Sequence, residues 1–266
     1  MPKDLIKDYW PIEQETVLLI KTDLSEFLQN FKSNQFSFPG LRTGTSVTIS
    51  SHDTYFDTSS QELGNIQAAL RLRKTADSVV IGVKGRDQWT TSGVSRIEIE
   101  EVWSANGVAT ILHYLDFMGV SLKHPGVPIG SAEPVSILGL MNLNPIQDRS
   151  LKRTVWPILD NVDQKICFLC LDEVTLNLSA EQIKYGEIEI ELVDGSVSAI
   201  KNLSDAILDK YSGFLQPWRY SKLQTGIAIE HLSKSSDIGD IVNKNGELTT
   251  SGISKIGEFL KNASVK

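Results

Sequence analysis

The segment Gly-Glu-Ile-Glu-Ile-Glu-Leu at residues 186–192 alternates a carboxylate with an aliphatic side chain. Side chains two residues apart in a β-strand lie on the same face, so this segment predicts a strand with one acidic face and one apolar face. Residues 69–74, Ala-Leu-Arg-Leu-Arg-Lys, alternate in the same way with guanidinium groups in place of carboxylates. The two segments predict a sheet whose strands carry charge of one sign on one face.

The period of two recurs along much of the chain and predicts about eight strands. Their expected ranges are 12–21, 47–57, 69–74, 79–84, 94–102, 151–159, 166–172 and 186–193. Apolar residues at helical spacing predict helices at 22–31, 106–118, 135–143, 196–211 and 253–260. Short strands separated by turns favour a closed antiparallel sheet, so the expected fold class is α+β, an eight-stranded antiparallel β-barrel with flanking helices.

Length and charge set broad limits on organisation and partners. We expect one barrel domain at residues 8–232 and a polar C-terminal appendage at 233–266. The formal net charge of −7 argues against general nucleic-acid binding, which normally needs a basic balance. No apolar run approaches the roughly 20 residues that cross a bilayer, and the N-terminal residues do not resemble a signal peptide. We therefore expect a cytoplasmic protein without membrane association.

The charged strand faces have two explanations. A sheet with its charged face in water accounts for any single strand. However, solvent-exposed faces usually mix the two signs, whereas here the signs are segregated by strand. The amphipathic helices also need an apolar sheet face to pack on. If they cover the outside of a barrel, the charged faces line its interior, which would suit an anion together with metal ions.

Nine short segments, in order along residues 12–227, resemble motifs of the CYTH family, the triphosphate tunnel metalloenzymes. The segments are Glu13-Gln14-Glu15, Thr54-Tyr55-Phe56-Asp57-Thr58, Ala69-Leu70-Arg71-Leu72-Arg73, Gly82-Val83-Lys84-Gly85, Ser95-Arg96-Ile97-Glu98-Ile99-Glu100, Arg153-Thr154-Val155-Trp156, Leu171-Asp172-Glu173, Gly186-Glu187-Ile188-Glu189-Ile190-Glu191-Leu192, and Ser221-Lys222 with Gly226. The resemblance implies a tunnel barrel that binds a small molecule containing a triphosphate and cleaves or rearranges it with Mg²⁺ or Mn²⁺.

The resemblance also implies roles for individual residues. The implied metal ligands are Glu13, Glu15, Glu98, Glu100, Asp172, Glu187, Glu189 and Glu191, and Glu187 is ambiguous because three alternating glutamates allow two registers. The implied phosphate-binding groups are Arg71, Arg73, Lys84, Arg153 and Lys222. The implied catalytic set is Glu13, Glu15, Lys84 and Arg153. Carboxylates outnumber basic groups in this lining, so a triphosphate is attracted only after divalent cations bind, which predicts strict metal dependence.

The sequence departs from the family pattern at Val17, where the N-terminal motif has a lysine that is associated with catalysis. Lys21 shares the strand face but lies roughly 13 Å further along, so it replaces that lysine only if the strand is bulged or the site is shifted. We expect a triphosphatase acting on inorganic triphosphate or a small organic triphosphate. A class IV adenylate cyclase, a thiamine triphosphatase and a binding module without turnover remain alternatives.

The two cysteines, Cys167 and Cys170, are spaced as a CxxC pair. A zinc site would need two further ligands, and the segment lacks the helix N-terminus that activates a redox thiol. We predict that both cysteines are small residues within a strand.

Overall fold

The computed structural model describes residues 10–33, 37–38, 40–90, 93–179, 181–235 and 238–263. The chain forms two compact units. Unit 1 comprises Met1–Glu13, Ser51–Gln88 and Ser95–Asp148, and unit 2 comprises Gln14–Ser50, Trp89–Val94 and Arg149–Lys266. Several strands begin in one unit and end in the other.

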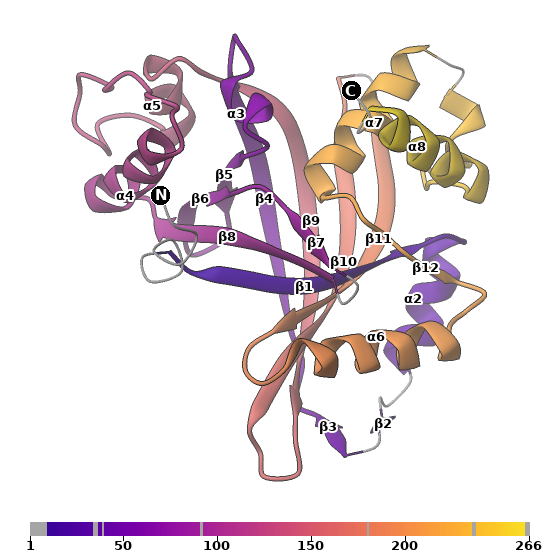
Figure 1. Ribbon diagram of the computed structural model, residues 1–266. Coiled ribbons are helices and arrows are strands. Elements are labelled where there is room, and N and C mark those ends of the chain that lie inside the picture. The colour runs from indigo at the N-terminus through magenta and orange to yellow at the C-terminus, as the bar shows by residue number, and fades with distance from the viewer. Residues whose placement is uncertain are drawn as a thin grey trace. The chain divides into compact units, whose positions relative to one another are not determined.

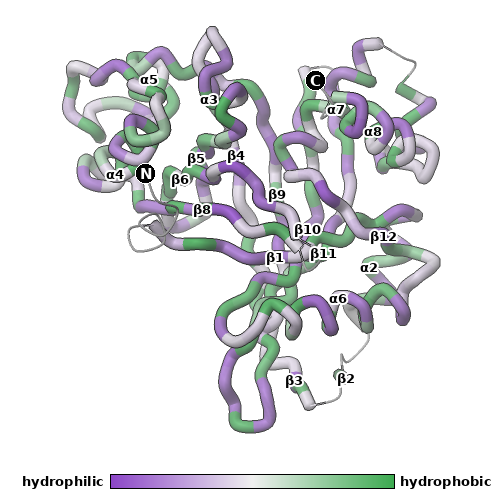
Figure 2. Tube along the Cα trace, viewed as in Figure 1, coloured by the Kyte–Doolittle hydropathy of each residue, from purple (hydrophilic) through white to green (hydrophobic). Residues whose placement is uncertain are grey.

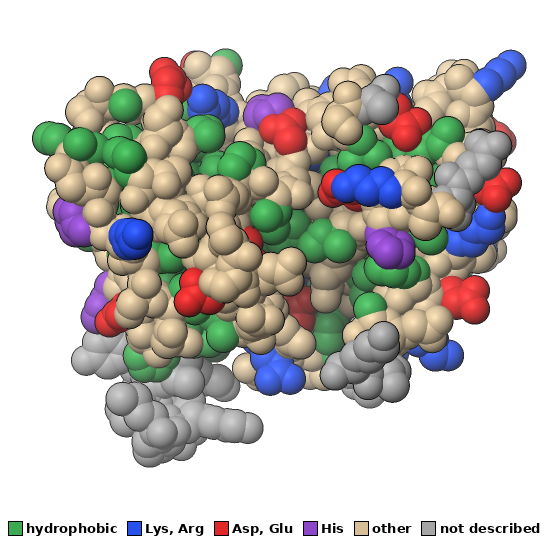
Figure 3. All heavy atoms as spheres, turned by 90° about the horizontal axis from the view of Figure 1, so that it is seen from above, with side chains coloured by type: hydrophobic (Ala, Val, Ile, Leu, Met, Phe, Trp, Pro, Cys, Tyr) green, Lys and Arg blue, Asp and Glu red, His purple; other side chains and the backbone are tan. Residues whose placement is uncertain are grey.

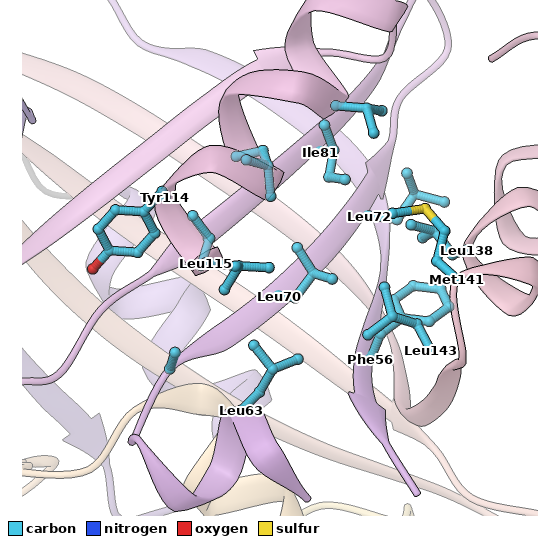
Figure 4. Packing of buried hydrophobic residues seen from close by; sticks show 14 of the residues in the cluster. Phe56, Leu63, Leu70, Leu72, Ile81, Tyr114, Leu115, Leu138, Met141 and Leu143 are labelled. Atoms are coloured by element: carbon cyan, nitrogen blue, oxygen red, sulfur yellow. The ribbon is translucent and has the colours of Figure 1, made fainter. Parts of the chain in front are cut away.

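Unit 1 contains four antiparallel strands in the order β4-β5-β6-β8. Their bounds are β4 Val47–Thr58, β5 Ala69–Lys74, β6 Val79–Lys84 and β8 Gly93–Val102, of which β4 and β8 begin in unit 2. Helices α3 (Glu62–Asn65), α4 (Ala105–Phe117) and α5 (Pro134–Leu140) accompany them. Apolar side chains on one face of the strands pack against these helices, as Figure 4 shows for Leu70, Leu72, Tyr114 and Leu138. The opposite face carries the charged residues.

Unit 2 contains the strand order β9-β10-β11-β1-β12. The bounds are β1 Ile12–Ile20, β9 Leu143–Leu159, β10 Lys165–Asn177, β11 Gln182–Leu192 and β12 Leu215–Pro217, and β1 and β9 begin in unit 1. The shorter strands β2 (Ser37–Phe38), β3 (Leu41–Thr43) and β7 (Gln88–Thr90) lie at its margins, with β3 paired to β9. Along β9 and β10 the tube in Figure 2 changes repeatedly between hydrophobic and hydrophilic colours, as strands with two different faces require.

Each face of the unit 2 sheet has its own apolar cluster. Leu18 and Ile20 of β1 pack on one face with α2 (Leu24–Ser33) and α6 (Val197–Lys210). Val17 and Leu19 pack on the other face with α7 (Lys222–Ser235) and α8 (Thr250–Ala263), which run beside each other in Figure 1. The second cluster fills only part of its face, and the charged residues occupy the next stretch of the same face.

The fold class is the one that the sequence predicts. The strand order β10-β11-β1-β8-β6-β5-β4-β9 closes on itself because β9 also pairs with β10. This is an eight-stranded antiparallel β-barrel with flanking helices. No helix in the described part of the chain has the length and apolar character needed to cross a membrane.

Some elements differ from the expected ranges. Strand β9 begins at Leu143, well before the expected residue 151. The first half of the strand was not predicted because it lacks a run of branched aliphatic residues. Helix α5 ends at Leu140 rather than 143. Helix α7 was not predicted, since several of its buried positions are polar or small, including Lys222, Thr225 and Gly226.

The segment expected as a polar appendage, 233–266, contains the 3₁₀ helix η1 (Ile238–Asp240) and α8. Ile241, Ile253 and Ile256 from this segment are buried in the apolar cluster with α7. Glu247 is also buried and accepts hydrogen bonds from Ser25 and Asn243. The segment therefore contributes to the core of unit 2.

Charged side chains outside these cores are dispersed. On the face shown in Figure 3, the described basic side chains lie scattered among acidic and apolar ones rather than in one patch.

Candidate functional site

The charged face of unit 1 is assembled by strand register. Asp53 of β4 lies opposite Arg73 of β5, and Lys84 of β6 lies opposite Glu98 of β8. Residues that are directly opposite in antiparallel strands share a face. The register therefore brings the predicted phosphate-binding groups of β5 and β6 onto the same face as the predicted acidic residues of β8.

Asp53 holds the two arginines of β5. Its carboxylate accepts two hydrogen bonds of 2.8 Å from the Nε and Nη2 atoms of Arg73, and one oxygen lies 3.7 Å from Nη1 of Arg71. The side chain of Asp53 is fully buried. A buried carboxylate that receives a two-pronged guanidinium contact fixes the plane of that guanidinium group. Arg71 also pairs with Glu98 and Glu100.

Lys84 and Arg96 share a carboxylate, Glu13. The Nζ atom of Lys84 lies 3.0 Å from Glu13 and 2.9 Å from Glu98, and Nη2 of Arg96 lies 2.7 Å from Glu13. Burial raises the pKa of Glu13, and Lys84 offsets part of that effect. Burial also acts to raise the pKa of Glu98, but Lys84, a hydrogen bond with Glu13 and Arg71 together outweigh it, so this pKa lies below its ordinary value. The two carboxylates therefore differ in their affinity for a proton.

The charged face of unit 2 is centred on Arg153 of β9. Its Nε and Nη2 atoms each lie 2.7 Å from an oxygen of Asp172, and Nη1 lies 2.6 Å from Glu191. Arg153 also contacts Glu189. Burial acts to raise the pKa of Asp172, but Arg153 and Lys222 lower it below its ordinary value. Asp172 is therefore held in its charged form.

Lys222, at the start of α7, is the second cation of this cluster, and its side chain is buried. Its Nζ atom lies 2.9 Å from Asp172 and 2.8 Å from Glu187, and it also contacts Glu189. Burial raises the pKa of Glu187 to about 7, against the opposing effect of Lys222. All three glutamates of β11 lie on the sheet face that contacts Arg153 and Lys222. The alternation in the sequence therefore places all three carboxylates in the site.

The unit 2 cluster has an excess of carboxylates. Four carboxylates, those of Asp172, Glu187, Glu189 and Glu191, contact two basic groups in the ion pairs of the described residues. Glu15, buried in β1, lies directly opposite Glu191, and their nearest carboxylate oxygens are within 4.8 Å. Like charges at this separation repel, and a divalent cation relieves that repulsion. Oxygen ligands of this kind suit Mg²⁺ and Mn²⁺, so the residues fit the metal that the sequence predicts.

Val17 occupies the position of the missing family lysine. It is buried in the apolar cluster with Trp218 and lies opposite Glu189. The pairing of β1 with β11 runs without a register shift from Glu15 to Leu19, and β1 ends at Ile20. Lys21 is therefore not brought into the place of Val17 by a bulge in this stretch.

The structure groups all of the predicted site residues into these two clusters. Unit 1 contains Glu13, Arg71, Arg73, Lys84, Glu98 and Glu100, and unit 2 contains Glu15, Arg153, Asp172, Glu187, Glu189, Glu191 and Lys222. Sequence reasoning assigned no role to Asp53 or Arg96. Arg96 lies on the same strand face as Glu98 and Glu100, so the alternation in the sequence could have identified it as a site residue. The partner of Asp53 follows only from the pairing of β4 with β5.

Comparison with protein families gives a match to the CYTH domain over residues 26–218. The match spans well over half of the chain, and the chain belongs to the CYTH family. No curated protein matches the sequence.

The chain is similar to several solved structures, of which one supports the same fold with a TM-score above 0.5. HpAC1 from Hippeastrum, described as a candidate adenylyl cyclase with a dominant triphosphatase activity, has a TM-score of 0.51 at 19% identity, over 81% of this chain and 95% of HpAC1. A candidate adenylate cyclase from Bacillus halodurans has a TM-score of 0.47 at 18% identity, over 80% of this chain and 97% of that protein. The PH1819 protein from Pyrococcus horikoshii OT3 has a TM-score of 0.44 at 17% identity, over 84% of this chain and 99% of that protein.

Proposed function

We propose that the protein is a metal-dependent triphosphatase that hydrolyses inorganic triphosphate or a small organic triphosphate to a phosphate and a shortened polyphosphate. One observation carries the proposal: the guanidinium group of Arg153, which is 20% exposed, and the buried ammonium group of Lys222 contact an excess of carboxylates on one face of the sheet. A face with both kinds of group suits a polyanion that is bound together with divalent cations. The triphosphatase activity described for HpAC1 supports the same reaction class.

The basic groups would bind the phosphates in two ways. Arg73 and Arg153 present planar guanidinium forks that match phosphate oxygens, whereas Lys84 and Lys222 act as point charges. Their present carboxylate partners keep them oriented before substrate arrives. Mg²⁺ or Mn²⁺ held by Glu15 and the glutamates of β11 would neutralise charge and polarise the phosphoryl oxygens.

A product-resolved assay tests the proposal. Purified protein is incubated with inorganic triphosphate, ATP or thiamine triphosphate and with Mg²⁺ or Mn²⁺, and phosphate and cyclic nucleotide are separated. Release of phosphate supports the triphosphatase, whereas cyclic AMP from ATP would identify a cyclase. Arg153→Met should lower the rate by at least 10²-fold, as expected when a group that stabilises transition-state charge is lost. Arg42→Met is the matched control, because Arg42 forms an exposed pair with Asp163.

A second candidate function is binding without turnover. The burial of Val17 in an apolar cluster favours this function, because the position of the family's catalytic lysine is occupied here by an apolar side chain that packs in the core. Tight binding of triphosphate with no phosphate release, together with a gain of turnover in Val17→Lys, would identify this function. The cytoplasmic location stays a prediction.

A further inference from the structure

An apolar band extends the charged face of unit 2. The hydroxyl groups of Thr48 (β4) and Thr154 (β9) lie 3.0 Å apart, so these two side chains share a face. Strand alternation then places Val47 and Ile49 on the opposite face, together with Arg153 and Val155. Val47 is 60% exposed and Ile49 is 46% exposed, which is unusual for branched aliphatic residues within a strand.

Strand β10 adds an aromatic ring to this band. Phe168 lies opposite Pro157 of β9 on one side and opposite Glu191 of β11 on the other, so it has the same strand phase as Arg153. Its side chain is partly exposed, and the Nζ atom of Lys165 lies 4.8 Å from the ring centroid. The band therefore consists of Val47, Ile49, Val155, Pro157 and Phe168.

The band is continuous with the phosphate-binding residues. Val155 is two residues from Arg153 along β9, a distance of about 7 Å. Phe168 lies opposite Glu191, which accepts a hydrogen bond of 2.6 Å from Arg153. Beyond the charged residues in the other direction, the same face carries the packed apolar cluster of Val17, Val174 and Trp218, together with the buried Arg149 of β9. A group attached to a phosphate at Arg153 therefore has exposed apolar surface on one side and packed core on the other.

We propose that this band binds the organic part of the substrate, so that the protein acts on a triphosphate monoester with an aromatic or apolar group rather than on inorganic triphosphate. The inference rests on the proposed function, because it takes Arg153 as a phosphate-binding residue. Contact with the organic group covers apolar surface that is otherwise in water, and it favours the organic ester over the bare anion. Val47, Ile49 and Phe168 are thus specificity-determining residues.

The test compares substrates rather than total activity. We measure kcat/KM for ATP, thiamine triphosphate and inorganic triphosphate with the wild type, with Ile49→Ser/Phe168→Ala, and with the control Val162→Ser, an exposed apolar residue in the β9–β10 turn. We expect the wild type to prefer at least one organic triphosphate. The double variant should lose at least tenfold in kcat/KM for that ester and less than twofold for inorganic triphosphate, and the control should match the wild type.

Equal losses for both kinds of substrate, or no loss, would overturn the assignment. If the wild type releases no phosphate from any of them, the proposed function fails, and equilibrium dialysis with ATP and inorganic triphosphate then tests the band separately. Tighter binding of ATP that disappears in the double variant supports the band without turnover, and equal binding of the two ligands contradicts it.

Discussion

Asp53→Asn tests whether the buried carboxylate of the unit 1 cluster positions Arg73. Asparagine has nearly the same shape as aspartate, but it carries no charge and replaces one acceptor oxygen with a donor NH₂ group. In the wild type both carboxylate oxygens accept 2.8 Å hydrogen bonds from Arg73. The substitution therefore leaves Arg73 with at most one of these bonds, and it weakens the 3.7 Å contact with Arg71.

The magnitude follows from burial. Asp53 is fully buried, and the Arg73 side chain is 19% exposed. Breaking a buried ion pair by removing one charge costs about 3–5 kcal/mol, because the remaining charge stays desolvated. We expect a loss of about 3 kcal/mol in the free energy of unfolding. Loss of a fixed guanidinium orientation should also lower kcat for phosphate release about 10²-fold.

Urea unfolding and phosphate release measure the two effects. The matched control is Asp163→Asn, because Asp163 also pairs with an arginine, Arg42, but both side chains are more than half exposed. An exposed pair contributes about 0–1 kcal/mol. Equal changes in stability for the two variants, or a stability loss at Asp53 with unchanged kcat, would refute the positioning role.

Three further predictions concern unit 2. Lys222→Met should abolish phosphate release and lower the free energy of unfolding by about 3–5 kcal/mol, because it leaves buried carboxylates without their cation. The exposed Lys234→Met should change neither quantity, and equal effects of the two substitutions would contradict this prediction. Burial raises the pKa of Cys167 to about 12, so a disulfide reagent at pH 8 should label it only after unfolding, and rapid labelling of native protein would show that the thiol is accessible. Gly252→Ala places a Cβ 2.2 Å from the Ile241 carbonyl oxygen and should lower the urea midpoint of unfolding. Gly213→Ala is the control, because a Cβ there meets open space, and equal midpoints for the two variants would show that α8 is not packed against Ile241.

The sequence predicted most strands because the physical cause is local. Alternation at 69–74 and 79–84 gives the observed bounds of β5 and β6, since each strand has one face in an apolar core. Alternation in 186–192 also identified the three glutamates that meet Arg153 and Lys222. The residue types at these positions were therefore sufficient to predict both the strands and their charged face.

Features that depend on distant contacts were not predictable in the same way. Helix α7 buries Lys222 and Thr225, so it lacks a purely apolar stripe, and its position follows from the carboxylates of β10 and β11. Asp53 stands among polar residues in the sequence, and only its pairing with β5 reveals its partner. The burial of Ile241, Ile253 and Ile256 likewise depends on a surface supplied by β10, β11 and α7.

Phosphate release from inorganic triphosphate and from a preferred organic triphosphate, titrated with Mn²⁺, tests the central claim most directly. We predict no phosphate release in excess chelator. The Mn²⁺ concentration that gives half-maximal phosphate release should rise at least tenfold in Glu191→Gln. Glu173→Gln should leave this Mn²⁺ concentration unchanged, because Glu173 lies on the face of β10 opposite to that of Asp172 and pairs with Lys152. Phosphate release that persists in chelator, or equal Mn²⁺ requirements for the two variants, would contradict the account.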